Sequence, residues 1–366
     1  MQQRIQRLRA ALATGGLPAL LVSAPASRRY LSGFTGSYGC LLITPEAALV
    51  LTDGRYVVQV AQQAPGFALR EVVNPGRPLP EVIAAAASEL GLHGLAFESA
   101  HTTVAEHAKL VAALGGAMEL LPSEGMVEGL RELKDADELA TLRRAAAITD
   151  AALAAVLPQL RPEQREREAA WMLEVALREA GAEAVSFAII VAAGPNAALP
   201  HHFPGDGLLG AGRPIVIDMG ARLDGYHADL TRTITLGPPD ARFHEIYAIV
   251  LEAQRRAIAG LRAGALSSDV DALAREHITA AGYGPQFGHG LGHGVGLDIH
   301  EAPGLRRAPP NGAGAPLRAG MVTSVEPGIY LEGWGGVRIE DLVLVTKDGS
   351  ELLSHAPKVG QASENL

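Results

Sequence analysis

Two pairs of acidic residues and one histidine are the side chains of this sequence best suited to carry out chemistry. The pairs are Asp218 with Asp229 and Glu326 with Glu340, and the histidine is His293, within the run GHGLGHGVGLDIHE. Four carboxylates and one imidazole form a suitable ligand set for two divalent cations. Two adjacent cations can activate a water molecule and polarise a carbonyl group at the same time. Such chemistry requires that the chain bring these residues together.

The first acidic pair lies in a predicted β-hairpin. An apolar run that contains Asp218 is followed by Asp224-Gly225, a strong hairpin signal, and then by an alternating strand. A turn centred just before Asp224 places Asp218 opposite Asp229, whereas a turn centred on Asp224-Gly225 places it opposite Thr231. In both registers the two carboxylates share one face, roughly 5–8 Å apart at Cβ. Ionised carboxylates this close repel each other unless a cation lies between them.

The second acidic pair repeats this arrangement in SVEPGIYLEGWGGVRIEDLVLV. Reflection about Gly333 places Glu326 opposite Glu340, and Arg338 shares a face with Glu340. The other face is apolar and is predicted to pack into the core; it holds Val337, Ile339, Val343 and Val345. Burying such acids without cations would be costly. Two hairpins with facing acids therefore predict a metal centre.

The surroundings of His293 are rich in glycine, which excludes a stable helix, permits close approach of the backbone and predicts a loop. His289 and His300 lie in the same region, and spacing alone does not identify the ligand among the three histidines. His227 shares the face of Asp229, and we interpret it as a buried strand histidine and not as a ligand.

The elements around these residues predict two domains and an α/β (α+β) fold class. Short apolar strands alternate with helices in the first third, which is typical of an α/β domain with a mixed sheet. The stretch from Leu121 onward is interpreted as a linker that runs into a helix, so the predicted domains are residues 1–128 and 129–366. The second domain holds two units of helices and antiparallel strands, with one acidic pair each and the metal site between them. Its predicted helices are residues 136–157, 164–179, 242–261 and 267–281.

Composition excludes several classes of protein. The net charge is −9 and no basic cluster occurs, which argues against a nucleic-acid partner. Cys40 is the only cysteine, which excludes an intrachain disulfide and a thiolate-rich zinc site. No apolar run is long enough to span a membrane, and the N-terminal helix pattern lacks the apolar core of a signal peptide. We therefore expect a cytoplasmic protein that contacts no membrane.

Five motifs resemble those of the dinuclear metallopeptidases of the pita-bread fold, such as methionine aminopeptidase, aminopeptidase P and prolidase. They are VIDMGA, HADLTRT, GHGLGHGVGLDIHE, SVEPGIY and GVRIEDLVLV. PALLVSAPASRRYLSGFTGS and LTDGRYVVQVAQ resemble a creatinase-like N-terminal domain, so the resemblance covers the whole chain and favours the Xaa-Pro peptidases. It implies a creatinase-like α/β domain followed by a pita-bread catalytic domain, whose antiparallel sheet has pseudo-two-fold symmetry and is flanked by helices.

The resemblance also implies a role for each site residue. Asp218 would chelate one metal, His293 and Glu326 the other, and Asp229 and Glu340 would bridge both. Glu326 would also act as proton acceptor. His201 matches a substrate-facing histidine, and His289 and His300 match histidines that contact the substrate or the tetrahedral intermediate. Arg338 matches an arginine beside the last ligand, whereas His202 has no counterpart.

The implied reaction is hydrolysis of the bond between an N-terminal residue and proline by a hydroxide that bridges two divalent metals. Manganese is the expected metal, with cobalt or zinc possible. The expected partners are a small Xaa-Pro peptide and a second copy of the chain. The compact N-terminal domain favours an Xaa-Pro dipeptidase over an aminopeptidase P acting on longer peptides. A metal-free creatinase-like hydrolase and a non-catalytic binding module are disfavoured because all five ligands are present. The segment Asp53–Tyr56 is either a contact to the partner subunit's active site or a plain surface turn.

Overall fold

The computed structural model describes residues 1–73, 76–310 and 312–358. The chain divides into two compact units, Met1–Arg131 and Glu132–Leu366. The boundary predicted between residues 128 and 129 falls within helix α6 (Met126–Arg131) and stays a prediction.

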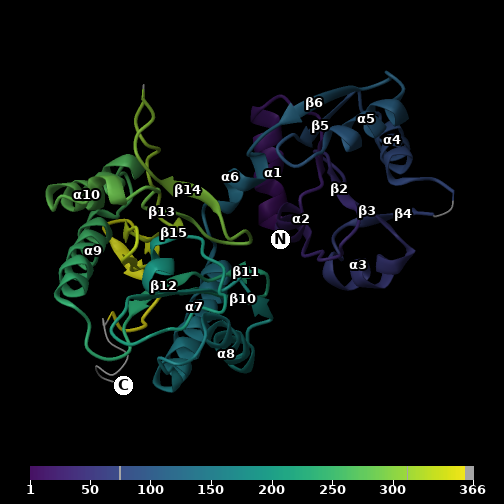
Figure 1. The fold of residues 1–366 in the computed structure, drawn as a ribbon. Helices are drawn as coiled ribbons and strands as arrows, with labels where there is room; N and C mark the ends of the chain where they lie inside the picture. The colour runs from purple at the N-terminus through teal and green to yellow at the C-terminus, as the bar shows by residue number, and fades with distance from the viewer. Residues whose placement is uncertain (74–75, 311, 359–366) are drawn as a thin grey trace. The chain divides into compact units, whose positions relative to one another are not determined.

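The first unit is built on a mixed six-stranded sheet with strand order β4-β3-β2-β1-β5-β6 (Figure 1). Strand β2 is antiparallel to both of its neighbours, and the other neighbouring pairs are parallel. The strands are β1 (Leu20–Val22), β2 (Cys40–Ile43), β3 (Ala48–Asp53), β4 (Ala68–Val72), β5 (Gly94–Glu98) and β6 (Glu119–Ser123). The helices besides α6 are α1 (Gln2–Thr14), α2 (Pro25–Ser32), α3 (Val57–Gln63), α4 (Leu79–Glu89) and α5 (Val104–Leu114). The predicted α/β domain with a mixed sheet is confirmed.

Two local expectations for this unit can be compared with the structure. Cys40 lies on β2 and is buried, and this burial raises the pKa of its thiol to about 12. The stretch from Leu121, interpreted as a linker that runs into a helix, contains the boundary between the two units, which follows Arg131. Before that boundary the stretch completes β6 and forms α6, where Val127 is fully buried.

The second unit contains two pairs of long helices, each packed beside its own group of strands. Helices α7 (Ala136–Val156) and α8 (Glu166–Glu179) contact each other and strands β7 (Ala184–Val185), β8 (Ile190–Ala193) and β10 (Ala221–Leu223). Helices α9 (Ala241–Gly260) and α10 (Ser267–Ala280) contact each other. Helix α10 also contacts β14 (Glu301–Leu305), and α9 contacts β15 (Val322–Val325), β16 (Gly328–Leu331) and β17 (Gly335–Arg338). Figure 1 shows α7 and α8 on one side of this unit and α9 and α10 on the other. The predicted helices therefore form, within a few residues of their predicted ends.

The strands of the second unit fall into two groups along the sequence. The first group is β7 (Ala184–Val185), β8 (Ile190–Ala193), β9 (Ile215–Met219), β10 (Ala221–Leu223), β11 (Tyr226–His227) and β12 (Leu230–Ile234). The second group is β13 (Gly292–Gly294), β14 (Glu301–Leu305), β15 (Val322–Val325), β16 (Gly328–Leu331), β17 (Gly335–Arg338), β18 (Asp341–Val345) and β19 (Ser350–Leu352).

Strand β12 joins the two groups. The Glu340 N–H donates to the Thr231 carbonyl oxygen over 3.1 Å, and the Arg338 N–H donates to Thr233 Oγ1 over 3.0 Å. Each group carries one acidic pair, so this junction brings the two pairs to one place. In the described residues, no helix combines the length and the apolar composition needed to cross a bilayer.

Candidate metal centre

The first acidic pair is set by the register between β9 and β12. Thr231 is the partner of Asp218 across these strands. Asp224 and Gly225 both have positive φ, at 47° and 74°, as a two-residue hairpin turn of type I′ requires. The register centred on Asp224-Gly225 is therefore correct, and the one that placed Asp218 opposite Asp229 is wrong. Asp229 directly precedes β12 and is the diagonal neighbour of Asp218.

The second acidic pair is set by the strands on both sides of it. Gly328 pairs with Arg338 across β16 and β17, and Val325 pairs with Asp341 across β15 and β18. Glu326 and Glu340 occupy the same position of this common register, as reflection about Gly333 predicted. The opposite face packs in the buried core as expected, with Val337, Ile339, Val343 and Val345.

His293 lies on a strand that the glycine-rich sequence did not predict. Residues Gly292–Gly294 form β13 between β14 and β15, where the sequence suggested a glycine loop. A Cβ atom at Gly292 would overlap the carbonyl oxygen of Ser324, and one at Gly294 would overlap that of Ala302. The glycines thus serve close strand packing, which fixes the histidine between them.

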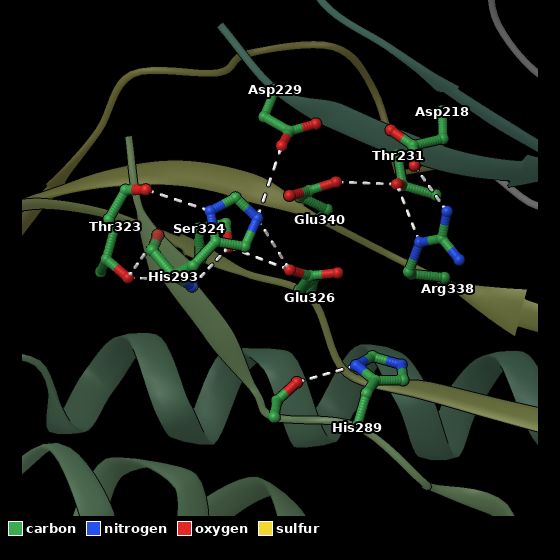
Figure 2. A network of polar contacts seen from close by, with 12 residues as sticks. Asp218, Asp229, Thr231, His289, His293, Thr323, Ser324, Glu326, Arg338 and Glu340 are labelled. Atoms are coloured by element: carbon green, nitrogen blue, oxygen red, sulfur yellow. Dashed lines mark hydrogen bonds and ion pairs between the residues drawn. The ribbon is translucent and has the colours of Figure 1, made fainter. Parts of the chain in front are cut away.

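Asp229, His293 and Glu340 each offer a ligand atom, and these atoms lie within 4.8 Å of one another. His293 Nε2 is 3.7 Å from an oxygen of Asp229 and 3.3 Å from one of Glu326, so the ring lies between two carboxylates (Figure 2). Its Nδ1 is 3.1 Å from the Gly294 carbonyl oxygen. An Nδ1–H that donates there leaves the Nε2 lone pair facing the acids, as a metal-ligating histidine requires.

The electrostatics of the acids also fit a bound cation. Burial, followed by repulsion from neighbouring carboxylates, raises the pKa of Asp229 and of Glu340 well above their ordinary values. Burial raises the pKa of Glu326 to about 7. Asp218 Oδ1 and Glu340 Oε1 are buried without a hydrogen-bond partner in the described part of the chain. Repelling acids with unused oxygens are the donor set expected of a site for hard divalent cations.

Three side chains that sequence reasoning missed orient these groups. Thr231 Oγ1 donates to Glu340 Oε2 over 2.7 Å and accepts from Arg338 Nε over 3.1 Å. Ser324 Oγ accepts the His293 N–H and donates to Glu326 Oε1 over 3.1 Å (Figure 2). The third is Tyr330, whose hydroxyl accepts from Arg338 Nη1. Two sequence signals pointed to Thr231, because it shares the strand face of Asp229 and one of the two predicted registers places it opposite Asp218.

A cavity of about 470 Å³ adjoins the acids. It is lined by all the predicted site residues: His201, Asp218, Asp229, His289, His293, His300, Glu326, Arg338 and Glu340. Apolar residues complete the wall, among them Phe187, Ile189 and Phe203. The structure therefore brings the predicted residues together around one space.

Arg338, Tyr330 and His289 form a hydrogen-bonded chain along this cavity. Arg338 Nη1 donates to the Tyr330 hydroxyl over 3.0 Å, and that hydroxyl is 3.0 Å from His289 Nε2. His289 Nδ1 is 2.8 Å from the Gly290 carbonyl oxygen, so the ring donates there and accepts from Tyr330. Burial lowers the pKa of His289 to about 4, which keeps the ring neutral. Arg338 Nη2 donates to Asp218 over 2.7 Å.

The remaining histidines differ in their surroundings. The ring of His300 lies 4.3 Å from that of His293, and burial lowers its pKa. His227 is also buried, with a lowered pKa, but it is not part of the ligand group formed by Asp229, His293 and Glu340.

In the first unit, Asp53 caps a short turn, Gly54–Tyr56, and pairs with the exposed Arg55.

Comparison with known proteins gives matches along nearly the whole chain. Residues 140–347 match metallopeptidase family M24, and residues 4–133 match the creatinase/prolidase N-terminal domain. The chain is 38% identical to the peptidase YqhT of Bacillus subtilis, over 97% of this chain and 98% of that one. The structure of an Xaa-Pro dipeptidase from Bacillus anthracis aligns with a TM-score of 0.94 at 40% identity, covering 98% of this chain and 99% of that one. An X-Pro aminopeptidase from Thermotoga maritima aligns with a TM-score of 0.89 at 37% identity and the same coverage.

Proposed function

Because the chain belongs to metallopeptidase family M24, we propose that it hydrolyses the bond between an N-terminal residue and proline as an Xaa-Pro dipeptidase. The observation that carries this proposal is the convergence of four carboxylates and His293 on one cavity. The similarity to the Bacillus anthracis enzyme, which bears that name, supports the substrate class.

The proposed ligands of two divalent cations are Asp218, Asp229, His293, Glu326 and Glu340. One imidazole among carboxylates, with no thiolate near, suits Mn²⁺ and also accommodates Co²⁺ or Zn²⁺. When bound, such a pair supplies a hydroxide near neutral pH and polarises the substrate carbonyl.

Glu326 is the proposed proton acceptor. Its carboxylate lines the cavity and lies 3.3 Å from His293 Nε2, so it can reach a proton of a molecule bound between the proposed ligands. Ser324 holds its Oε1 in place. Cleavage must deliver a proton to the leaving proline nitrogen, which carries no hydrogen in the peptide.

His300 and His201 are the histidines free to contact the substrate. Within the described residues neither makes a side-chain hydrogen bond, whereas both ring nitrogens of His289 are engaged by Gly290 and Tyr330. The lowered pKa of His300 keeps that ring neutral at pH 7, with one N–H to donate to a developing oxyanion. We therefore assign the oxyanion contact to His300 and the orientation of Arg338 and Tyr330 to His289.

A substrate panel tests the proposal and its alternative, an aminopeptidase P that acts on longer peptides. The alternative is supported by the Thermotoga maritima neighbour, and the dipeptidase by the compact first unit. We expect rapid hydrolysis of Ala-Pro and little of Ala-Pro-Ala or Ala-Ala. Rapid release of alanine from the tripeptide would contradict a strict dipeptidase.

Metal analysis separates the hydrolase from a metal-free creatinase-like enzyme or a binding module. We expect two bound transition-metal ions per chain, loss of activity with a chelator, and recovery with Mn²⁺. Activity that survives complete removal of metal would refute a metal-dependent reaction.

We also propose a cytoplasmic homodimer that binds no nucleic acid. The net charge of −9 supports the last point, and the homodimer rests on the resemblance of the motifs. Light scattering that gives the mass of a single chain would contradict the dimer.

A further inference from the structure

The carboxylate of Glu166, at the start of α8, is buried outside the proposed ligand set. Its side chain is 0% exposed, and no lysine or arginine of the described residues forms an ion pair with it. One oxygen accepts from the Ala193 N–H over 2.9 Å and from Asn196 Nδ2 over 2.8 Å. The other lies 2.8 Å from His202 Nε2 and accepts from the Gly205 N–H over 3.2 Å. Four hydrogen-bond donors therefore satisfy this buried carboxylate.

Burial alone would raise the pKa of Glu166, but these hydrogen bonds outweigh it and hold the pKa below the ordinary value. The carboxylate is therefore ionised at neutral pH. Because an ionised carboxylate has no hydrogen to donate, His202 must present an Nε2–H to it. This fixes the tautomer of a neutral His202 ring.

All four donors belong to residues 193–205, which we call the wall segment. This segment supplies Pro200, His201, His202 and Phe203 to the lining of the cavity. Its end is also tied to the start of α8, because the Arg167 N–H donates to the Gly205 carbonyl oxygen over 3.2 Å. A Cβ atom at the nearby Gly207 would lie 3.2 Å from the Glu166 carboxyl carbon, so the chain fits closely around this group.

We propose that Glu166 is a positioning residue of the active site, which acts through His202 and the wall segment to hold His201 at the cavity. This inference rests on the proposed function for its kinetic consequence. The four donors require a carboxylate, because a carboxylate offers two acceptor oxygens whereas a glutamine side chain offers only one. A glutamine that keeps the contacts to Ala193 and Asn196 would turn its NH₂ group toward His202 and Gly205, which both need an acceptor.

The test compares Glu166→Gln with Asp206→Asn. Asp206 is a matched control because it also ties this region to the start of α8, through exposed ion pairs with Arg165 and Arg167. Three quantities are measured: kcat and KM for Ala-Pro with Mn²⁺, the metal content, and the ¹⁵N chemical shifts of the His202 ring in the metal-free protein.

For Glu166→Gln we expect kcat to fall about 10- to 100-fold, the loss typical of groups that orient active-site ligands. Metal content should stay at the wild-type level, and the His202 Nε2 signal should move from the protonated to the unprotonated position. Asp206→Asn should stay within about two-fold of wild type in kcat. Wild-type kcat in Glu166→Gln, or an unchanged His202 tautomer, would overturn the inference.

The inference stays testable if Glu166→Gln does not fold or if the wild type has no Xaa-Pro peptidase activity. If Glu166→Gln does not fold, His202→Asn decides, since it leaves the carboxylate and removes one donor. It should lower kcat and shift the backbone amide signals of residues 199–205, and the inference fails if both stay at wild-type values. If the wild type cleaves no Xaa-Pro peptide, the proposed function fails, while the ¹⁵N shifts still test the positioning by Glu166.

Discussion

Thr231 connects the two acidic pairs through a single hydroxyl group. It is the strand partner of Asp218, it donates to Glu340, and it accepts from Arg338. Arg338 in turn donates to Asp218. One small side chain therefore orients a carboxylate from each hairpin, and its removal should affect both.

The first prediction is that Thr231→Val lowers the affinity for Mn²⁺ by about 10- to 100-fold, as expected when a partner of metal ligands is lost. Valine keeps the β-branched shape, so the strand should persist. Thr235→Val is the matched control, because Thr235 lies on the same face of the chain and its hydroxyl donates to Gly237. Calorimetric titration of the metal-free protein gives the affinities, and equal values for the two variants would contradict this role of Thr231.

The second prediction concerns the proposed bridging ligands. Asp229→Ala and Glu340→Ala should each lower activity on Ala-Pro by more than the 100-fold or so that loss of an orienting partner causes. Each should also bind fewer metal ions per chain. A near-normal rate in saturating Mn²⁺ for either variant would show that the assignment is wrong.

The third prediction separates a substrate contact from a metal ligand. His201 lines the cavity on the same segment as Pro200 and His202, apart from both acidic hairpins. His201→Ala should therefore lower kcat while the metal content stays near that of the wild type. A parallel loss of both would make His201 a ligand.

At the scale of residues, type and spacing, together with the resemblance of the motifs, predicted the groups that converge on the cavity but not their hydrogen-bond partners. Reflection about Gly333 related Glu326 to Glu340 because a hairpin fixes register within a short stretch of chain. The Thr231–Glu340 hydrogen bond spans 109 positions of sequence, and no local rule fixes such a pair. His289, His293 and His300 are separated by the contacts that each ring makes, which depend on the folded surroundings.

At the scale of elements, β13 shows where local propensity fails. Glycine disfavours strands, and GHGLGHG has no apolar alternation, so the sequence predicted a loop. Tertiary packing determines the structure of this segment instead of local propensity. Strands β14 and β15 approach β13 too closely for any side chain at Gly292 or Gly294. The long amphipathic helices and the Asp224-Gly225 turn were predictable because their signals are local.

The fourth prediction follows from this packing. Gly294→Ala should destabilise the protein by roughly 1–3 kcal/mol, the usual effect of overpacking, and should weaken metal binding by displacing His293. Gly288→Ala is the matched control, because nothing lies within 4 Å of a Cβ atom at that position of the same glycine-rich run. Urea denaturation of both variants measures the free energy of unfolding. Equal stabilities would mean that β13 can accept a side chain.

At the scale of the whole molecule, the buried acids of the proposed metal centre make the stability of the protein depend on pH and on bound metal. The fifth prediction concerns the metal-free protein, in which burial raises the pKa of Glu326 to about 7 and also raises those of Asp229 and Glu340. Between the unfolded pKa of such groups, about 4, and their folded pKa, the folded state holds more protons than the unfolded state. These carboxylates therefore make a contribution to the stability of the metal-free protein that falls as pH rises through this window.

Mn²⁺ binds the ionised carboxylates, so its stabilising effect should grow over the same window. We expect the rise in Tm caused by Mn²⁺ to be larger at pH 7.5 than at pH 5, as measured by calorimetry at fixed metal concentration. Glu340→Gln removes one of the repelling acids and should reduce the loss of stability that these acids cause in the metal-free protein as pH rises over that range. An identical pH dependence of the metal-free Tm in Glu340→Gln and in a wild type that binds Mn²⁺ would show that these carboxylates are not held together without the cation.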